Sequence, residues 1–348
     1  MSAKDESWLV TPTPASACAI IAEVGQNHDG SLGLAHAHID AAAKAGADAI
    51  KFQTHIAEEE SSPLEPWRTT FSSQDATRMD YWRRMEFTEH QWRELKQHAD
   101  DAGIHFLSSP FSIKAVHLLE KLGVSAWKIA SGEINNLPLL DSVIATNKPI
   151  ILSTGLSDLE EITSAFNYVE RNNNPLALLQ CTSQYPSSAE RIGINVIDEF
   201  RRKFGCAVGL SDHSGSIYSG LAAATLKIQI LEVHITLSRE MFGPDVVASV
   251  TTDELKTLIK GVRQIETMIT NPVDKSTIHP DAVELRKIFM KSLYTTRDIK
   301  KGEKITNNDL TTKKPGTGIP ASKINDIVGK KTNKNIEANS MIQPGDLE

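Results

Sequence analysis

Eight short β-prone runs alternate with amphipathic stretches between Cys18 and Asn271, and this alternation limits the possible folds more than any other feature. The runs are CAIIAEV, DAIKFQT, HFLSSPF, AWKIASG, PIILSTG, LALLQCTS, CAVGLSD and IQILEVHIT. Most are apolar along much of their length, which is typical of strands buried on both faces of a parallel sheet. Helical patterns lie between most of the runs, at residues 32–46, 88–103, 113–123, 137–147 and 159–172, and a last pattern covers 252–269.

Eight strand–helix units in residues 18–271 have the size of a TIM (β/α)8 barrel. We therefore expect this α/β fold, with an open doubly wound sheet as the alternative, because sequence alone does not show whether a sheet closes. Residues 56–80 interrupt the alternation, since they are polar, contain two prolines and show no clear periodicity. We expect a long loop there, which is either a lid over a substrate or a floppy insertion.

The pattern changes after Asn271, where prolines and polar residues follow the last helical stretch. The remaining tail has short β-prone pieces and Gly-containing turn signals, and nothing in it repeats the barrel pattern. About 60 residues of this kind form a small β-rich domain with a marginal core. We predict an N-terminal extension at 1–17, a barrel at 18–271, a linker at 272–290 and a small domain at 291–348.

Charge and composition exclude several classes of function. A net charge of −7 argues against general attraction to nucleic acid or to anionic membranes. The N-terminus has no apolar core of signal-peptide length, and no run approaches ~18 apolar residues. Cys18, Cys181 and Cys206 open or end apolar runs, so we interpret them as core residues in a reducing compartment. We expect a cytoplasmic protein without nucleic-acid or membrane partners.

Two histidines, His213 and His234, lie at the ends of consecutive β-prone runs. Because α/β proteins gather functional residues at the carboxyl ends of their strands, this pair could hold one divalent metal. Two imidazoles are too few for a closed structural zinc site, but they suit Mn²⁺ or Mg²⁺-like catalysis in which substrate and water complete the shell. The alternative is a pair of structural histidines. Of the other nine, only His28 and His55 lie near strand ends.

Polar side chains follow the other strands as well. Lys51 and Lys128 lie inside apolar runs, where a lysine must be paired or face a wet cavity. Together with hydroxyl groups at strand ends, they suit a small anion that carries phosphate and carboxylate. Strand ends are usually polar, which accounts for a single serine there but not for two lysines inside apolar runs. Glu23 and Glu133 also follow strands, and each could move a proton or hold a substrate hydroxyl group.

In their order along the chain, several stretches resemble the sialic acid synthase family, which includes N-acylneuraminate, legionaminate and pseudaminate synthases. They are IAEVGQNHDGS, GADAIKFQTH, FLSSPFS, WKIASGEINNLPLL, KPIILSTGL, LLQCTSQYP, VGLSDHSG, EVHITL and GPD. In the tail, RDIKKGEKIT, KKPGTGIP and IVGKK resemble the antifreeze-like, or SAF, domain of those enzymes. The resemblance implies a metal-dependent condensation of phosphoenolpyruvate with an N-acylated hexosamine. The products would be a nine-carbon 2-keto-3-deoxy sugar acid and phosphate.

The resemblance also implies roles for single residues. His213 and His234 would hold Mn²⁺, or alternatively Mg²⁺ or Co²⁺, which would polarise the sugar aldehyde, and Glu23 and Glu133 would flank the reacting carbons. Gln53 would line the pocket. Tyr185 and Asp245 would meet the amino sugar. The residues that would cradle phosphoenolpyruvate are Lys51, Ser109, Lys128, Ser131, Ser153, Ser183 and Ser211.

Three departures from the family pattern concern the sugar. In the family, the small domain reaches across a dimer and offers an arginine before Pro-Gly to the partner's sugar site, which implies a domain-swapped homodimer. Here the matching residue is Lys314, which keeps the charge but loses the planar fork. Ser183 stands where some sialate synthases have asparagine, and Val233 replaces a basic residue common in the family. The acceptor therefore stays open between N-acetylmannosamine, a 2,4-diacetamido-trideoxyhexose and a plain hexose.

Two other functions fit parts of the sequence. A barrel aldolase would act on pyruvate through a Schiff base on Lys51 or Lys128, which borohydride trapping would reveal. The pair of histidines argues against this alternative. A non-catalytic carbohydrate-binding or ice-binding protein is suggested only by the tail, and it leaves the lysines and histidines inside apolar runs unexplained.

Overall fold

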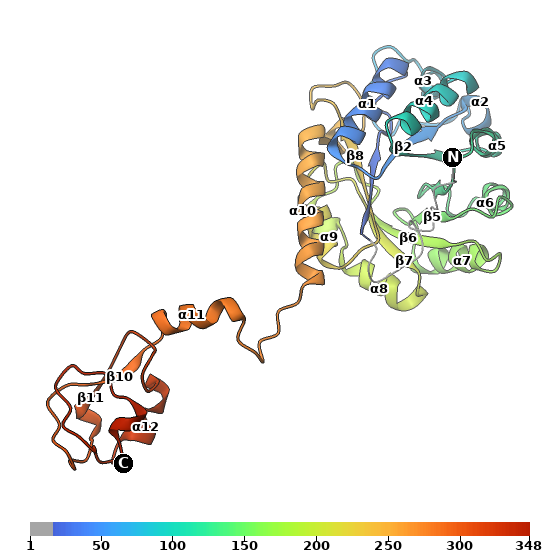
Figure 1. Cartoon of the computed structure of the whole chain (residues 1–348). Helices are drawn as coiled ribbons and strands as arrows, with labels where there is room; N and C mark the ends of the chain where they lie inside the picture. The colour runs from blue at the N-terminus through green and yellow to red at the C-terminus, as the bar shows by residue number, and fades with distance from the viewer. Residues whose placement is uncertain (1–16) are drawn as a thin grey trace. The chain divides into compact units, whose positions relative to one another are not determined.

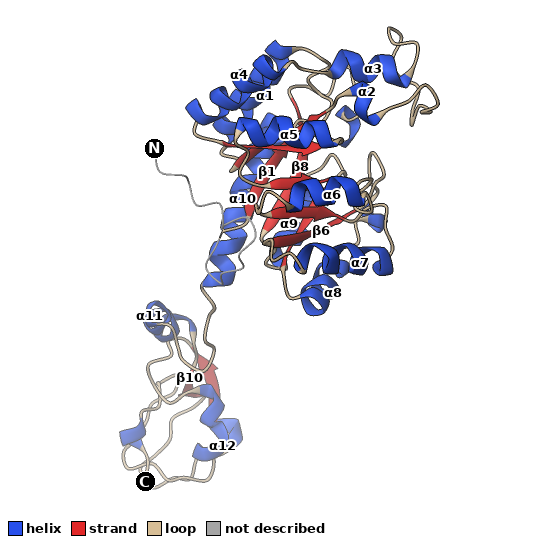
Figure 2. Cartoon of the chain, turned by 90° about the vertical axis from the view of Figure 1, so that its right-hand side faces the viewer, coloured by secondary structure: helices blue, strands red, loops and turns tan. Residues whose placement is uncertain are grey.

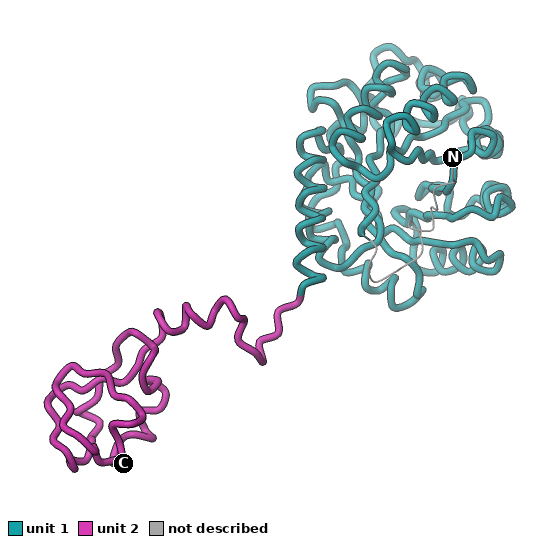
Figure 3. The backbone as a smooth tube through the Cα atoms, in the orientation of Figure 1, with its two compact units in different colours: residues 1–271 teal, residues 272–348 magenta. Residues whose placement is uncertain are grey.

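The structure is a computed structural model that describes residues 17–348. The chain divides into two compact units, Met1–Asn271 and Pro272–Glu348, which are described separately (Figure 3). The predicted N-terminal extension at 1–17 lies, apart from Ala17, outside the described residues. Within the described range, no helix has the length and apolar character needed to span a membrane.

Unit 1 contains a nearly closed parallel barrel with helices on its outside (Figures 1 and 2). The hydrogen-bonded order is β3-β2-β1-β8-β7-β6-β5-β4, and the two end strands contact each other. This arrangement confirms the TIM-type barrel over the open sheet. The strands are β1 Ala19–Glu23, β2 Ala49–Thr54, β3 His105–Pro110, β4 Trp127–Ile129, β5 Ile150–Ser153, β6 Leu176–Cys181, β7 Ala207–Asp212 and β8 Ile230–Thr236, with the short β9 Val250–Thr251 beside β8.

The helices of the outer layer include all six that the sequence pattern predicts. These are α1 Leu32–Ala45, α4 Glu89–Asp101, α5 Ile113–Leu122, α6 Leu137–Ile144, α7 Leu159–Glu170 and α10 Thr252–Thr270. Two more, α8 Asn195–Phe204 and α9 Tyr218–Thr225, were not predicted. The sequence of α9, YSGLAAAT, has little apolar periodicity because its residues are small. The small size is needed, since a Cβ atom on Gly220 would lie 2.9 Å from the Leu231 side chain.

The strands bury apolar side chains on both of their faces. Outward-facing residues such as Ile20 and Phe52 pack beneath the helices. A second cluster of buried apolar residues lies inside the barrel, and half of its members are alanine: Ala19, Ile21, Ala49, Leu107, Ala126, Ile151, Ala177, Leu179, Ala207 and Ile230. They fill the amino-terminal half of the barrel, so the polar inward-facing residues of the other half meet at its carboxyl end.

Residues 56–80, expected as a loop, form part of an insertion between β2 and α4 that has helices of its own. It contains α2 Ala57–Glu60 and α3 Arg78–Met85, and Thr77 caps α3 in a capping box with Asp80. Tyr81, Trp82 and neighbouring residues form a separate apolar cluster, against which Trp67 and Phe71 pack. The missing periodicity therefore reflects a small core made of scattered aromatic residues.

Unit 2 is small and contains an antiparallel pair, β10 Ser292–Thr295 and β11 Leu310–Lys313, and the short α12 Ile324–Ile327. Its core consists mainly of isoleucine and leucine side chains, among them Leu293 and Ile342. The segment predicted as a linker, 272–290, contains the helix α11 Pro280–Phe289, which begins with a proline at its first turn. All residues of α11 are at least partly exposed.

Candidate active site

The carboxyl end of the barrel surrounds a cavity of about 510 Å³. Side chains from all eight strands or the loops after them line it, as does the insertion after β2. Every site residue predicted for unit 1 is among the lining residues, whereas Lys314 lies in unit 2 with its ammonium 5.1 Å from the Phe289 ring centroid. The predicted lining residues are Glu23, Lys51, Gln53, Ser109, Lys128, Ser131, Glu133, Ser153, Ser183, Tyr185, Ser211, His213, His234 and Asp245.

Parallel register brings the polar residues of neighbouring strands side by side. Glu23 of β1 is in register with Lys51 of β2 on one side and with His234 of β8 on the other. Ser211 of β7 is in register with Glu232 of β8. Because side chains alternate along a strand, Glu232 and His234 point to the same inward face. The barrel thus assembles residues that are up to about 210 positions apart in the chain.

Two buried lysines and two buried glutamates form an ion network on the floor of the cavity. The Lys51 ammonium lies 2.6 Å from Glu23 and 3.8 Å from Glu232. The Lys128 ammonium lies 3.3 Å from Glu232 and donates a 2.6 Å hydrogen bond to Ser153. These lysines are paired and face the cavity, as their place in apolar strands requires.

Burial and pairing shift the pKa values of the network in opposite directions. Burial raises the pKa of Glu23 and lowers that of Lys128. Burial alone would lower the pKa of Lys51, but Glu23 and Glu232 outweigh it and the pKa is raised. Burial would raise the pKa of Glu232, but Lys128 and Lys51 hold it below its ordinary value. Glu232 is therefore the fixed counter-charge of the network, and Glu23 is the carboxyl group better able to take up a proton.

Glu232 was not predicted as a site residue, although the sequence contains the signal. It is the only charged residue in the apolar run IQILEVHIT apart from the histidine. A glutamate inside a buried strand needs a partner or a wet cavity for the same reason that Lys51 and Lys128 do. Ser211 donates a 2.9 Å hydrogen bond to Oε1 of its carboxylate.

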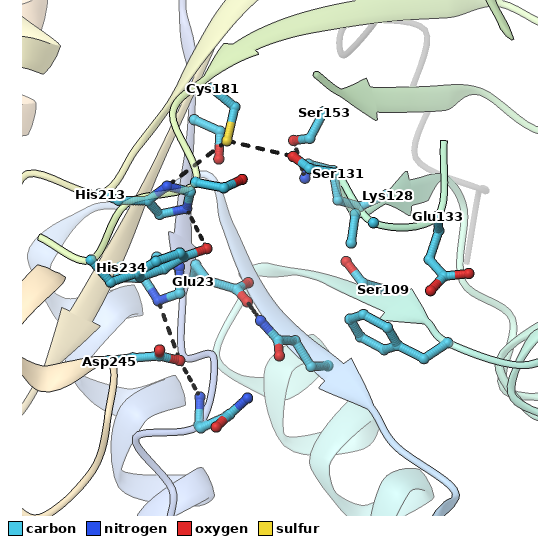
Figure 4. Close-up of a pocket in the computed structure, with 18 of the residues that line it drawn as sticks. Glu23, Ser109, Lys128, Ser131, Glu133, Ser153, Cys181, His213, His234 and Asp245 are labelled. Carbon is cyan, nitrogen blue, oxygen red and sulfur yellow. Dashed lines mark hydrogen bonds and ion pairs between the residues drawn. The ribbon is translucent and has the colours of Figure 1, made fainter. Parts of the chain in front are cut away.

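His213 and His234 lie together, with ring centroids 5.1 Å apart (Figure 4). The Nδ1 atom of His213 lies 2.9 Å from the carbonyl oxygen of Thr182, and its Nε2 atom lies 3.1 Å from the Tyr185 hydroxyl group. The Nδ1 atom of His234 is buried 4.0 Å from Asp245 and has no hydrogen-bond partner within residues 17–348. Burial lowers the pKa of His234 to about 3, so its ring is neutral, which is the form that binds metals.

The two imidazoles fit a divalent metal that takes its remaining ligands from outside the protein. Among residues 17–348, no group of three or more His, Cys, Asp or Glu residues is arranged to hold a metal. Gly25 makes room at this point: its φ is +54°, and a Cβ atom there would lie 2.7 Å from Asp245 and 2.9 Å from the His234 ring. Gly25 thus lets Asp245 and the His234 ring lie close to the backbone of the loop after β1. The Nδ1 atom of His234, which has no hydrogen-bond partner among the described residues, is consistent with a ligand at this ring.

Glu133 lies across the pocket from the two histidines (Figure 4). Asn136 donates a 2.6 Å hydrogen bond to its carboxylate, and burial raises its pKa. Of the two histidines near strand ends, His55 lines the pocket between the rings of Trp82 and Phe111. His28 is buried against Phe87 and is not a lining residue.

Some residues line the pocket although the sequence did not predict them there. Cys181 is buried, as expected of a core residue, but its sulfur also faces the pocket, 3.8 Å from Nδ1 of His213 (Figure 4). The three cysteines are free thiols. The insertion contributes Glu60, Glu65, Arg68, Arg78 and Trp82, which no periodic pattern marks.

Known proteins resemble the chain along almost its whole length. Residues 38–274 match the NeuB family and residues 291–348 match the SAF domain. The chain is 37% identical to the N,N'-diacetyllegionaminic acid synthase of Campylobacter jejuni subsp. jejuni serotype O:2, over 93% of this chain and 98% of that protein. It is 33% identical to the N-acetylneuraminate-9-phosphate synthase of Homo sapiens, over 93% of this chain and 91% of that protein.

A solved structure has the same architecture. The crystal structure of N-acetylneuraminic acid (sialic acid) synthetase from Leptospira borgpetersenii serovar Hardjo-bovis, in complex with citrate, superposes with a TM-score of 0.67. The two chains are 29% identical, and the match covers 77% of this chain and 90% of the other.

Proposed function

Since this chain belongs to the NeuB family, we propose that it is a nonulosonic acid synthase. It condenses phosphoenolpyruvate with an N-acylated hexosamine and releases a nine-carbon 2-keto-3-deoxy sugar acid and phosphate. The observation that supports this most directly is the pairing of Lys51 and Lys128 on the floor of one cavity with His213 and His234 on its wall. The relatives favour this function over the Schiff-base aldolase, because those named here are synthases.

The floor of the cavity suits phosphoenolpyruvate. Its phosphate and carboxylate need cations and hydroxyl donors, which Lys51, Lys128 and the serines at the strand ends provide. Ser109 and Ser153 already contact the two ammonium groups, so the donors are held in place before a ligand arrives. Such preorganised donors lower the barrier because they need not rearrange during the reaction.

The reaction joins C3 of the enol to the aldehyde carbon of the sugar, and positive charge develops at C2. Water adds at C2, and phosphate then leaves by cleavage of its bond to C2. One proton from the water ends on the former aldehyde oxygen and the other leaves with phosphate. Glu23, whose pKa burial raises, accepts a proton from that water, and Lys51 and Lys128 hold the departing phosphate. Glu133 and Tyr185 orient the sugar.

A divalent metal, with Mn²⁺ preferred over Mg²⁺ or Co²⁺, would when bound act as a Lewis acid toward the sugar aldehyde. His213 and His234 are the residues that would hold it. The carbonyl oxygen of Thr182, 2.9 Å from Nδ1, keeps the His213 ring in place, and Nε2, which lies 3.1 Å from the Tyr185 hydroxyl group, is the nitrogen that would face the metal. Asp245 lies beside His234 and accepts a 3.1 Å hydrogen bond from the backbone of Gln26, which fixes its position.

Phosphate release is expected only when phosphoenolpyruvate, an acceptor sugar and a divalent metal are all present. A panel of N-acetylmannosamine, a 2,4-diacetamido-trideoxyhexose and a plain hexose identifies the acceptor, with the product read by mass spectrometry. Chelation should abolish turnover, and Mn²⁺ should restore it, because the aldehyde is too weak an electrophile alone. A rate that survives chelation contradicts the metal role, and the absence of any product across the panel contradicts the synthase.

We further propose that the enzyme works as a domain-swapped homodimer in which Lys314 reaches the partner's sugar. Residues 1–271 hold 23 Lys or Arg against 34 Asp or Glu, whereas residues 272–348 hold 14 against 10. Opposite net charges favour docking of unit 2 on a barrel. Helix α11 also exposes Val283, Leu285, Ile288 and Phe289, an apolar surface that a partner would cover.

Co-expression of two variants tests this assembly. His234→Ala and Lys314→Ala chains should each be poorly active alone at low sugar concentration. In a mixed dimer, the intact barrel of the Lys314→Ala chain would receive Lys314 from the other chain, so part of the activity should return. If the co-expressed pair is no more active than the sum of the separate variants, or if the protein sediments as a monomer, the shared site is wrong. We propose a cytoplasmic location, which the three free cysteines support because disulfides are rare in that compartment.

A further inference from the structure

The outer wall of the pocket is made by the insertion after β2, to which the proposed reaction assigns no role. Two of its cations line the pocket, Arg68 and Arg78. Arg78 is largely buried, lies 4.5 Å over the Trp82 ring and pairs with Glu65 at 3.4 Å. Arg78 therefore packs within the insertion. Arg68 differs, because its contacts are with residues outside the insertion.

Arg68 extends from the insertion to the opposite side of the pocket mouth. Its Nη2 atom donates a 3.2 Å hydrogen bond to Asp245, which follows β8. Its guanidinium carbon lies 4.3 Å from the ring centroid of Tyr185, which follows β6. The side chain is still 41% exposed, and no other hydrogen-bond partner of Arg68 occurs in the described part of the chain.

We propose that Arg68 binds the acceptor sugar and contributes to its selection. This inference rests on the proposed function, because it assumes that a sugar occupies the space beside Tyr185 and Asp245. A guanidinium has five N–H donors in a planar fork, and within the described part of the chain Arg68 uses only one of them. Stacking on Tyr185 fixes the plane of the fork, and the unused donors remain for a ligand.

The charges around Arg68 indicate which part of the reactants it meets. Asp245 balances the charge of Arg68, so the arginine is suited to donate hydrogen bonds to uncharged oxygens rather than to hold a second phosphate. The phosphate and carboxylate of phosphoenolpyruvate have their own cations, Lys51 and Lys128, on the floor of the cavity. Arg68 therefore faces hydroxyl groups or the acyl oxygen of the sugar.

The insertion does not depend on Arg68 for its fold. It has an apolar cluster with Tyr81 and Trp82 at its centre, and Arg84 ties it to the barrel through a 2.7 Å ion pair with Asp29. Removal of a partly exposed side chain at the pocket mouth leaves these contacts in place. The Arg68→Ala variant should consequently fold like the wild type.

Steady-state kinetics of three variants test the proposal. Arg68→Ala should raise KM for the acceptor sugar by roughly tenfold to a hundredfold, the loss expected when a hydrogen bond from a charged donor disappears. KM for phosphoenolpyruvate should stay unchanged. Arg68→Lys keeps the charge but not the planar guanidinium, so KM for the acceptor sugar should stay close to that of Arg68→Ala. The control is Arg83→Ala. Arg83 lies in the same insertion, but it pairs with Glu58 and does not line the pocket.

The outcomes separate this proposal from the proposed function. If the wild type turns over no acceptor sugar, the synthase function fails before Arg68 is at issue. If the wild type is active and Arg68→Ala leaves KM for the sugar unchanged, Arg68 does not bind the sugar. Equal rises in both KM values, or a lowered melting temperature, would show that Arg68 only supports the wall of the pocket.

Discussion

Replacement of His234 by alanine is expected to lower kcat by about a thousandfold or more while the barrel stays folded. A Lewis acid at a carbonyl supplies several kcal/mol of transition-state stabilisation, and each 1.4 kcal/mol corresponds to a tenfold change in rate. His234 is buried, and its Nδ1 atom has no hydrogen-bond partner among the described residues, so the protein loses no hydrogen bond at this atom when the ring is removed. Turnover and metal content per chain are the measurements.

The matched control for His234→Ala is His117→Ala, which removes an exposed imidazole from α5. The control should retain both its bound metal and its turnover. Circular dichroism and the melting temperature verify that both variants fold. If His234→Ala binds metal and turns over like the wild type, the role assigned to the pair of histidines is wrong.

Replacement of Glu232 by glutamine should both destabilise the protein and abolish most of its activity. The glutamate lies 3.3 Å from Lys128 and 3.8 Å from Lys51, and the amide keeps its shape but not its charge. Breaking a buried pair in this way costs roughly 3–5 kcal/mol, because it leaves a charge without compensation. Denaturant unfolding measures the stability. KM for phosphoenolpyruvate should rise, because Lys51 and Lys128 lose the carboxylate that holds their ammonium groups in place.

The loss in stability caused by Glu232→Gln should depend on pH. The folded-state pKa of Glu232 lies below the ordinary value, so its charge stabilises the fold fully above that ordinary value. The difference in unfolding free energy between wild type and variant should therefore be constant near neutral pH and shrink in acid. Glu120→Gln on the exposed face of α5 is the control and should match the wild type. An equally stable Glu232→Gln protein contradicts the account of the ion network.

Residues at strand ends could be predicted because their positions follow from a local rule. Once a run is recognised as a strand of a parallel barrel, its last inward-facing residues must face the common pocket. This rule brought Glu23, Lys51 and His234 together from the sequence alone. It also covers Glu232, which needed only the observation that a charge inside a buried strand requires a partner.

Arg68 shows why the rest could not be predicted. Its partner Asp245 is 177 residues away, and the two meet only because the barrel closes and the insertion folds over its mouth. The insertion is held by scattered aromatic residues such as Trp67 and Phe71, which produce neither the period of a helix nor that of a strand. Helix α9 was missed for a related reason, because its small residues serve close packing rather than an apolar stripe.

The separate apolar cluster of the insertion has a consequence for how such enzymes diversify. The insertion has an apolar core of its own, so another segment that keeps the contacts of Tyr81 with Gln26 and of Trp82 with His55 could replace it with little repacking of the barrel. If Arg68 binds the acceptor as proposed, the part of the sugar site that the insertion supplies could change separately from Tyr185, Asp245 and the residues that hold phosphoenolpyruvate. Exchange of this stretch between homologues would then shift the preference among acceptors and leave the bond-forming residues of the recipient in place.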